Sequence, residues 1–240
     1  MNGGPVMVQH VEDPMQTVSA RIADHITVLQ RQQEHVILAV VGGRSAKAVF
    51  EYLQKDDIRW RHVHIMMADE RLVPVDHPQS NFCIVAQYLA NPLIKSGKLP
   101  ADHVHPFVLR TDSEKKAVSE YDAILKRLGG VFDIIFLSAG EDGHVAGLFP
   151  EHHSIQNRSK GFFAMHDAPK EPPHRMTASV RLIRSSGRAV LIFSVAEKRQ
   201  ALQRFQDPNL LLHSCPAKII QDIPIADVYA DMYADAHATT

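Results

Sequence analysis

The sequence predicts an α/β protein built on a doubly wound, mostly parallel, Rossmann-like sheet with helices on both faces. Continuous apolar runs, typical of strands buried on both faces, occupy residues 36–41, 63–68, 132–139 and 189–196. Between them lie amphipathic stretches whose apolar residues recur every three or four positions, as on one face of a helix. Strands that alternate with helices are joined by crossovers and run parallel. We expect residues 1–240 to form a single α/β domain.

The helices and the less regular segment follow from local patterns. The first helix has its apolar face at Met15, Val18, Ile22, Ile26 and Leu29. A second helix is entered through Ser80-Asn81, which are good capping residues. For a third, residues 111–114 resemble a capping box, and Gly129-Gly130 ends the helix. Residues 162–183 are rich in proline, and we expect strands there that are joined by a hairpin or a loop.

Composition excludes several classes of protein. Apolar residues make up 45% of the chain and charged residues 22%, which excludes wholesale disorder. The net charge is -1, so no uniform basic field favours a nucleic acid. The cysteines Cys83 and Cys215 form no disulfide framework, which favours a reducing compartment. The sequence has neither a signal-peptide pattern nor 18 consecutive apolar residues, so we expect a cytoplasmic protein that binds no membrane.

The turn after the first apolar run is a candidate anion-binding site. Gly42-Gly43-Arg44-Ser45 opens an amphipathic stretch, so free backbone N–H groups at a helix start would face an anion. Ligands of doubly wound sheets bind beyond the carboxyl ends of the strands, where this turn lies. The segment matches neither the Walker phosphate loop nor the dinucleotide fingerprint. A tight turn without a ligand is the alternative.

Charged residues also follow the second and third runs. Asp69-Glu70-Arg71 ends the second, and Arg71 would hold an anionic substrate or a developing negative charge. Alternatively, Arg71 pairs with a neighbouring carboxylate at a solvated strand end. The third run ends in a glycine-bracketed turn that carries Asp142 and His144. A histidine there can act as a general base, with a carboxylate that fixes its tautomer.

Two further cations, Arg175 and Lys198, could join the Gly42-Gly43 turn around one phosphate, although basic residues are usually just solvated. Metal binding has little support. The pairs His62-x-His64 and His103-x-His105 have no carboxylate or third ligand at metal spacing, and H-E-x-x-H is absent. We therefore predict no metal. G-x-S-x-G is also absent, which argues against a serine-nucleophile hydrolase.

Together these segments resemble the 6-phosphogluconolactonase family of the pentose phosphate pathway over roughly residues 36–231. The resemblance rests on the Gly42-Gly43 turn and on segments whose order matches the family: Asp69-Glu70-Arg71 with Val73-Pro74 and Ser80-Asn81, Gly140-Glu141-Asp142-Gly143-His144 with Leu148-Phe149-Pro150, Pro172-Pro173-x-Arg175-Met176-Thr177, and Glu197-Lys198. The sequence departs from the family pattern at Arg44, Ala46, Ser138 and Val195. The related glucosamine-6-phosphate deaminases have Asn-Glu-Pro where this chain has Leu148-Phe149-Pro150.

The resemblance implies a hydrolase that opens 6-phospho-D-glucono-1,5-lactone to 6-phospho-D-gluconate without metal or organic cofactor. It assigns His144 as the base on water, Asp142 as its support and Arg71 as the stabiliser of the carbonyl oxygen. The phosphate would be held by Gly42, Gly43, Arg44, Ser45, Arg175 and Lys198. The partner is then a small sugar-phosphate lactone, and we expect a monomer or a small homo-oligomer. A deaminase or isomerase of glucosamine 6-phosphate, or a non-catalytic sugar-phosphate sensor, is the alternative.

Overall fold

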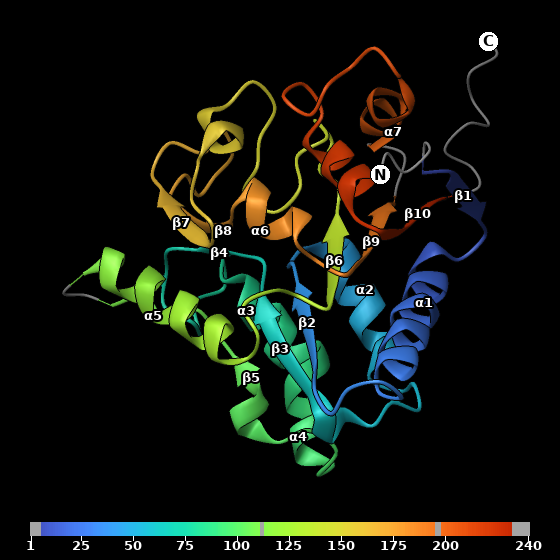
Figure 1. Cartoon of the computed structure of the whole chain (residues 1–240), viewed down its shortest axis with the longest axis vertical. Helices are drawn as coiled ribbons and strands as arrows, with labels where there is room; N and C mark the ends of the chain where they lie inside the picture. Colours follow the sequence, from blue (N-terminus) through green and yellow to red (C-terminus); the bar gives the residue numbers. More distant parts are fainter. Residues whose placement is uncertain (1–5, 111–112, 195–197, 232–240) are drawn as a thin grey trace.

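The computed structural model describes residues 6–110, 113–194 and 198–231, which are coloured in Figure 1. In this part of the chain, a seven-stranded sheet has the order β1-β10-β9-β6-β2-β3-β5, and every neighbouring pair is parallel. Its strands are β1 (Val8–Val11), β2 (Val36–Val40), β3 (Val63–Met67), β5 (Val104–His105), β6 (Ile134–Ser138), β9 (Arg188–Phe193) and β10 (Ile225–Asp231). The predicted doubly wound, mostly parallel sheet is confirmed.

Helices cover this sheet, and a small antiparallel sheet lies beside it (Figure 1). The small sheet has the order β4-β8-β7, with β4 at Asp69–Arg71, β7 at Phe162–Met165 and β8 at Arg175–Ala178. The helices are α1 (Pro14–Leu29), α2 (Arg44–Leu53), α3 (Asn81–Val85), α4 (Asn91–Lys95), α5 (Glu114–Arg127), α6 (Val180–Arg184) and α7 (Arg199–Gln206). Helix α1 packs on α2 and on β6, β9 and β10. A π-helical turn at Ala86–Ala90 joins α3 to α4.

The predicted helix boundaries are partly confirmed. Ser80 caps α3, since its hydroxyl accepts a hydrogen bond from the Cys83 backbone N–H. Helix α5 is capped instead by Ser113, which accepts from the Lys116 backbone N–H at 3.2 Å, so the capping box at 111–114 is wrong. Residues 111 and 112 themselves lie outside the described residues. Gly129 and Gly130 end the helix with φ angles of 127° and 83°, which favour glycine.

The proline-rich segment differs from its prediction at one end. The strands β7 and β8 are antiparallel neighbours, as expected for a hairpin or looped pair. The chain then forms helix α6, where we predicted continued strand. Ser179 caps this helix by accepting from the Leu182 backbone N–H. Val180, Leu182 and Ile183 are buried, so tertiary packing stabilises a turn of helix despite its β-branched residues.

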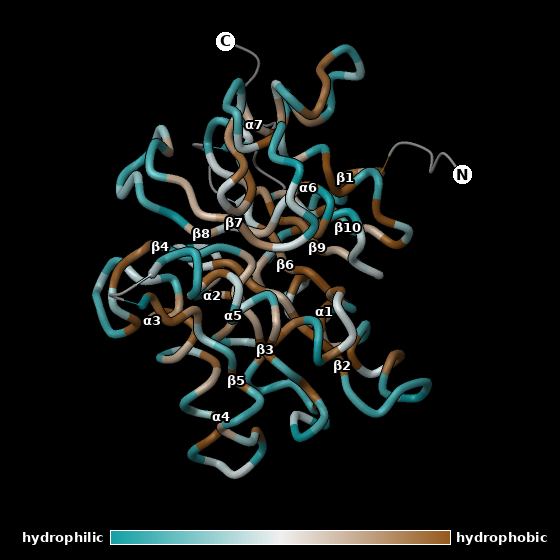
Figure 2. Tube along the Cα trace, turned by 60° about the vertical axis from the view of Figure 1, so that its left-hand side comes forward, coloured by the Kyte–Doolittle hydropathy of each residue, from teal (hydrophilic) through white to brown (hydrophobic). Residues whose placement is uncertain are grey.

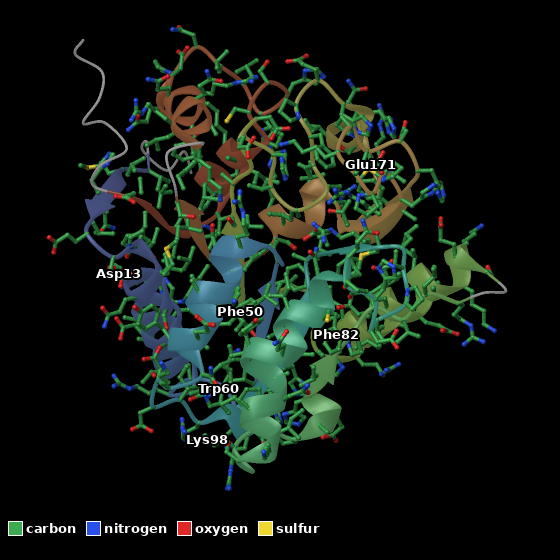
Figure 3. The ribbon with its side chains drawn as sticks, turned by 180° about the vertical axis from the view of Figure 1, so that it is seen from behind. Asp13, Phe50, Trp60, Phe82, Lys98 and Glu171 are labelled. Atoms are coloured by element: carbon green, nitrogen blue, oxygen red, sulfur yellow. The ribbon has the colours of Figure 1, made fainter. Side chains whose placement is uncertain are left out.

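The core along the central strands is almost wholly apolar, and His64 in β3 is a polar exception. All five residues of β2 are buried, as are all five of β3, and Figure 2 shows hydrophobic colour gathered inside and hydrophilic colour on the outer loops. Phe50 on α2 and Trp60, which are labelled in Figure 3, are fully buried against this sheet. In the described ranges, no helix has both the length and the apolar character that a membrane crossing demands. The central strands therefore leave polar chemistry to their ends.

A polar contact holds α1 against β10. Asp227 on β10 accepts hydrogen bonds from the ring of His25 at 2.7 Å and from Arg21 at 2.9 Å, both on α1. His25 is 2% exposed and the Asp227 side chain 10%. Burial opposes ionisation of Asp227, but the bonds from His25 and Arg21 outweigh it and lower the pKa of this carboxyl. The ionised carboxylate therefore stabilises the fold.

Replacing Asp227 with Asn should lower the free energy of unfolding at pH 7 by about 1.5–3 kcal/mol, the usual contribution of a charged hydrogen bond. Because the folded-state pKa lies below the ordinary value of 3.8, this contribution is complete above that pH and disappears as acid protonates the folded protein. Urea unfolding at several pH values measures it. The exposed Asp24→Asn variant makes the same charge change on α1 and should cost little. A difference that stays constant down to pH 3 would contradict this role.

Candidate active site

A cavity of about 520 Å³ opens where the main parallel strands end. Its wall is formed by the residues that follow β2 and β6, by β4 and β8, and by Lys198. Every predicted site residue except Asp142 lines it: Gly42, Gly43, Arg44, Ser45, Arg71, His144, Arg175 and Lys198. The volume falls within the range of about 300–1,000 Å³ that small-molecule sites occupy. Five segments far apart in sequence thus meet around one small ligand-sized space.

His144 and Asp142 form a hydrogen-bonded pair at the edge of this cavity. Nδ1 of the His144 ring lies 2.5 Å from Asp142 Oδ1, and the His144 backbone N–H also donates to that oxygen, at 3.2 Å. The His144 side chain is 19% exposed and that of Asp142 29%. An acceptor at Nδ1 favours the tautomer in which Nε2 is free to take a proton. The pair therefore has the form of an oriented general base.

Glycines shape the turn that carries this pair. A Cβ at Gly140 would lie 2.0 Å from the His144 ring, so only glycine leaves room for the imidazole. Gly143 has a φ of 87° and donates its N–H to the Gly140 carbonyl at 3.0 Å, which closes the turn. On its other side the His144 ring packs on Phe149, with centroids 4.8 Å apart. These contacts fix the orientation of the imidazole.

Asp142 stays ionised over the physiological range. Burial alone would raise the pKa of its carboxyl, but the hydrogen bonds from the ring and backbone of His144 lower it well below its usual value. Lys170, whose ammonium lies 3.7 Å from Oδ1, adds to this lowering. Asp142 can therefore accept from the histidine permanently, and it supports a positive charge on the ring when the ring takes a proton.

The glycine turn that follows β2 forms another part of the cavity wall. Gly42 lies against Asn81, because a Cβ there would approach the Asn81 side chain to 2.2 Å. Gly43 precedes α2 with a φ of 105°. Arg44 is the first residue of α2 and is exposed, and it makes no hydrogen bond or ion pair with another described residue. Arg44 does not pair with Glu70, whose carboxylate is held by other groups.

Lys198 is held by two hydroxyl groups. Its ammonium donates to Ser138 at 2.9 Å and to Ser45 at 3.3 Å, and the Ser45 hydroxyl also pairs with Ser194. Ser45 is buried, so this polar group lies at the base of the cavity. Ser138 stands where the resembling family commonly has glycine, and here it supplies a hydrogen-bond acceptor to the lysine. Val195, another departure from that pattern, lies outside the described residues.

Glu70 has a structural role that the sequence did not reveal. Its buried carboxylate accepts from the backbone N–H groups of Arg71, Asn81 and Phe82 at 2.6–2.7 Å and from the Ser80 hydroxyl at 2.9 Å. Burial raises its pKa, against the opposing effect of the backbone bonds. Glu70 thus caps the start of α3 and holds the strand end in place. The alternative for Arg71, a pair with a neighbouring carboxylate, is not formed among the described residues.

Arg71 faces the cavity with part of its guanidinium free of protein contacts. Nη1 donates to the Gln79 carbonyl at 2.7 Å, which orients the side chain. Nε is buried and has no hydrogen-bond partner among the described residues. A buried N–H without a partner is costly in a folded protein unless water or a ligand accepts from it. Nε itself is closed off from the cavity, so only the rest of the guanidinium can face a ligand there.

Arg175 is largely committed to the protein itself. Its Nε donates to the Pro172 carbonyl at 3.0 Å, and Nη2 donates to the carbonyls of Lys170 and Glu171 at 3.1 and 3.2 Å. The side chain is buried, and its guanidinium lies 5.4 Å above the centre of the Phe149 ring. Arg175 thus holds the 170–172 loop, which presents Lys170 to the cavity. Arg175 therefore has fewer N–H groups left to donate to a phosphate than its predicted role requires.

Several polar residues in the cavity wall were not predicted as site residues. They are Asp69, Asn81, Ser138, Glu141 and Lys170. Asn81 donates from Nδ2 to the Asp69 side chain at 3.0 Å, while its Oδ1 is buried without a partner in the described part of the chain. The sequence did hold a signal for Asn81, because Ser80-Asn81 belongs to the same family-like segment as Asp69-Glu70-Arg71. No sequence signal distinguished Lys170, since only the fold brings its loop to Asp142.

Comparisons with known proteins place this geometry in context. Residues 9–227 match the family described as glucosamine-6-phosphate isomerases/6-phosphogluconolactonase. The 6-phosphogluconolactonase of Borreliella burgdorferi is 26% identical over 85% of this chain and 87% of its own length. That of Neisseria meningitidis is 30% identical over 80% and 83%. The crystal structure of 6-phosphogluconolactonase from Thermotoga maritima, at 24% identity, has a TM-score of 0.81 over 94% of this chain and 99% of that one, which shows a shared fold.

Proposed function

The chain belongs to the glucosamine-6-phosphate isomerase/6-phosphogluconolactonase family, and we propose that it hydrolyses 6-phospho-D-glucono-1,5-lactone to 6-phospho-D-gluconate. This reaction is a step of the pentose phosphate pathway. The observation that carries the proposal is the pairing, in one cavity, of a carboxylate-oriented histidine with several cationic side chains. A lactone is an internal ester, so its hydrolysis needs an activated water, a stabiliser for the carbonyl oxygen and a handle for orientation.

His144 acts as the general base on water. Nε2 takes a proton from the water as the water oxygen bonds to the lactone carbonyl carbon, and the C=O electrons move onto the carbonyl oxygen. Asp142, held at Nδ1, stabilises the imidazolium that forms. Collapse of the intermediate re-forms the carbonyl and breaks its bond to the ring oxygen. The imidazolium then returns the proton to that ring oxygen, which leaves the open-chain acid and a neutral histidine.

Arg71 stabilises the negative charge that grows on the carbonyl oxygen. Its place in the cavity wall, where the Gln79 carbonyl orients the guanidinium, supports this role, because a preorganised cation in a partly desolvated site stabilises an oxyanion strongly. The phosphate binds at the other side of the cavity, against the start of α2. Free backbone N–H groups there, the Arg44 guanidinium and the Lys198 ammonium all favour an anion. The substrate is thus held at both ends.

The related deaminase activity is the alternative, and a direct assay distinguishes it from lactone hydrolysis. In this chain Leu148 and Phe149 stand where the deaminases have Asn-Glu, and both are fully buried, so this segment adds no acid or base to the cavity. Freshly made 6-phosphogluconolactone should be hydrolysed much faster than its spontaneous rate, with no ammonia released from glucosamine 6-phosphate. Ammonia release without lactone hydrolysis would establish the deaminase, and binding without turnover of either compound would establish a sensor.

Replacing His144 with Asn should lower kcat by roughly 10²–10⁴-fold and change KM much less, because the base acts in the transition state. His153→Asn is the matched control, since His153 also pairs with an aspartate, Asp167 at 2.8 Å, but outside the cavity. Near-normal turnover in a folded His144→Asn protein would exclude the assignment.

The phosphate contacts can be separated by comparing the phosphorylated lactone with gluconolactone. Lys198→Ala and Arg44→Ser should each raise KM for the phosphorylated lactone about 10- to 150-fold, the equivalent of about 1.5–3 kcal/mol, and weaken inhibition by inorganic phosphate. Gluconolactone should be affected little. Arg175→Ala should impair both lactones alike, because it releases the 170–172 loop.

Lys47→Ser is the control for Arg44→Ser, since Lys47 is an exposed cation of the same helix whose ammonium lies over the Tyr88 ring, 4.6 Å from its centre. It should leave KM and phosphate inhibition unchanged. If Arg44→Ser behaves like Lys47→Ser, Arg44 is a tolerated surface residue. If Lys198→Ala impairs both lactones equally, the lysine supports the fold of the cavity rather than the phosphate.

A further inference from the structure

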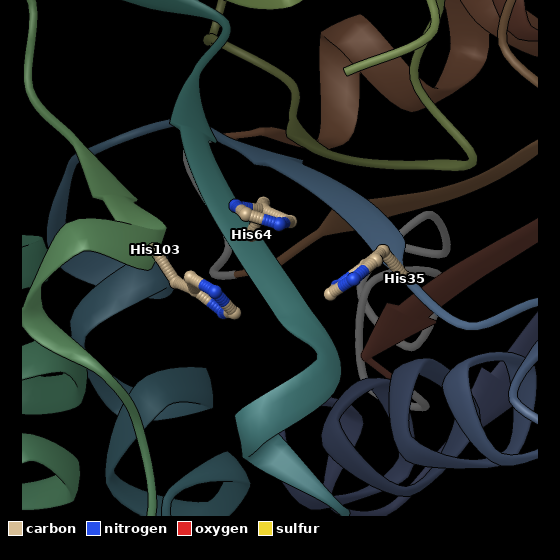
Figure 4. A group of neighbouring side chains, drawn as sticks. All are labelled: His35, His64 and His103. Atoms are coloured by element: carbon tan, nitrogen blue, oxygen red, sulfur yellow. The ribbon is translucent and has the colours of Figure 1, made fainter.

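A cluster of imidazole rings lies at the starts of three neighbouring strands, β2, β3 and β5. His35 directly precedes β2, His64 is the second residue of β3, and His103 directly precedes β5 (Figure 4). One ring nitrogen from each of the three lies within 4.8 Å of the other two. The ring centroids of His64 and His103 are 4.0 Å apart, and His35 lies 5.2 and 5.8 Å from them. The fold thus gathers three nitrogen ligands at one point.

The sequence did not predict this group, because His62-x-His64 and His103-x-His105 lacked a third ligand at metal spacing. The third ligand is His35, which parallel pairing brings alongside. Strand β2 pairs with β3, with Ile37 opposite His64, and β3 pairs with β5. The residue before β2 therefore lies near the start of β3. Only the order of strands in the sheet makes the three histidines neighbours.

Two further histidines complete the surroundings of the three rings. His105 Nε2 lies 3.1 Å from His64 Nδ1, and the two rings stack at 18°. A partner of this kind at one ring nitrogen commonly fixes the tautomer of a metal-binding histidine and leaves its other nitrogen free. The His62 ring lies 6.0 Å from His35. Nδ1 of His62 and Nδ1 of His103 are both buried without hydrogen-bond partners in the described part of the chain.

The ligand chemistry of the cluster suits a transition-metal ion. Neutral imidazole is the form that binds zinc, copper or nickel ions. Two carboxylates lie near the cluster: Glu34, whose Oε1 is 3.7 Å from His35 Nε2, and Asp102, which is close enough to His64 for its charge to act on the ring. Their negative charge would favour binding of a divalent cation.

We propose that His35, His64 and His103 bind one divalent transition-metal ion of the zinc class, with His105 as the hydrogen-bonded support of His64. Zinc–nitrogen bonds of about 2.0–2.1 Å in tetrahedral geometry place the ligand nitrogens about 3.4 Å apart. The side chain of His35 is 46% exposed, so it can turn to close the remaining gap. Three protein ligands leave a fourth position for water.

The proposed metal site is separate from the cavity. The strands β2 and β3 run parallel, so their starts lie at one edge of the sheet and the cavity residues that follow them lie at the other. Figure 3 shows this separation: Trp60, two residues before His62, and Lys98 lie at one end of the molecule, and Glu171, beside the cavity residue Lys170, lies at the other. A metal ion at these histidines would therefore contribute to stability, not to hydrolysis.

A second group could compete for metal and serves as the control. His152, His153 and Asp167 also place three ligand atoms within 4.8 Å of one another. However, the His153 and Asp167 side chains are 57% and 63% exposed, and the two already bond each other at 2.8 Å. Among the residues that the structure describes, no hydrogen bond between rings supports this group in the way that His105 supports His64. We therefore expect the tighter site at His35, His64 and His103.

The test is a titration of the chain without an affinity tag, in its metal-free form at pH 7.5. Zinc competition against a chromophoric chelator should show one tight site per chain, and cobalt should give visible absorption bands of low coordination number. His35→Ala and His103→Ala change the two more accessible ligands, and each should weaken zinc binding at least about 10- to 100-fold. Zinc should raise Tm in the unsubstituted chain but not in these variants. His153→Ala should keep both the tight site and the Tm shift.

The outcomes separate this proposal from the proposed function. Lactone hydrolysis should be the same in the unsubstituted chain, His35→Ala and His103→Ala, with or without zinc, because the cavity is remote. Circular dichroism checks that both variants remain folded. Absence of tight zinc binding, tight binding unchanged in both variants, or binding lost only in His153→Ala would each overturn the metal site. None of these results would bear on hydrolysis at His144.

Discussion

The burial of the central strands on both faces is the constraint from which both proposed sites follow. Strands such as β2 and β3 are buried along their whole length, so they accept almost only apolar side chains. Most polar groups therefore lie just before or just after each strand, with His64 in β3 and Asp227 in β10 as buried exceptions. Because the strands run parallel, the residues after them converge at one edge, where the cavity lies. The residues before them converge at the other edge, where His35 and His103 flank the start of β3.

Loops at a sheet edge need their own polar contacts, and part of the charge around the cavity serves this purpose. Glu70 takes three backbone N–H groups and a hydroxyl, and Arg175 takes three carbonyls of the 170–172 loop. Buried polar groups that are fully satisfied in this way hold a single geometry. That geometry leaves other groups in the cavity wall: the His144 ring, the Arg71 guanidinium and the Arg44 side chain. Within one short motif, a residue that holds a loop, such as Glu70, is therefore followed by a residue that lines the cavity, such as Arg71.

The sequence predicted the fold and most of the residues that line the cavity, because both depend on strong local patterns. Continuous apolar runs identified the main strands, and the glycine-rich residues that follow them identified Gly42-Gly43 and the turn of His144. Long-range pairing is not visible in such patterns. The edge strands β1 and β5, the antiparallel β4, the position of Lys170 beside Asp142 and the approach of His35 to His64 all depend on it. The roles of Glu70 and Arg175 were also missed, since a motif shows which residues are present and not which atoms they contact.

A crystal structure with bound 6-phosphogluconate, the product of the proposed reaction, tests the central claim most directly, because one ligand reports on both ends of the cavity. The phosphate should lie at the start of α2, within hydrogen-bond distance of Lys198 and Arg44. The carboxylate formed from the lactone carbonyl should lie beside His144, with one oxygen facing Arg71. A phosphate bound at His144 with the carboxylate at the Gly42-Gly43 turn, or a ligand bound outside the cavity, would contradict the account.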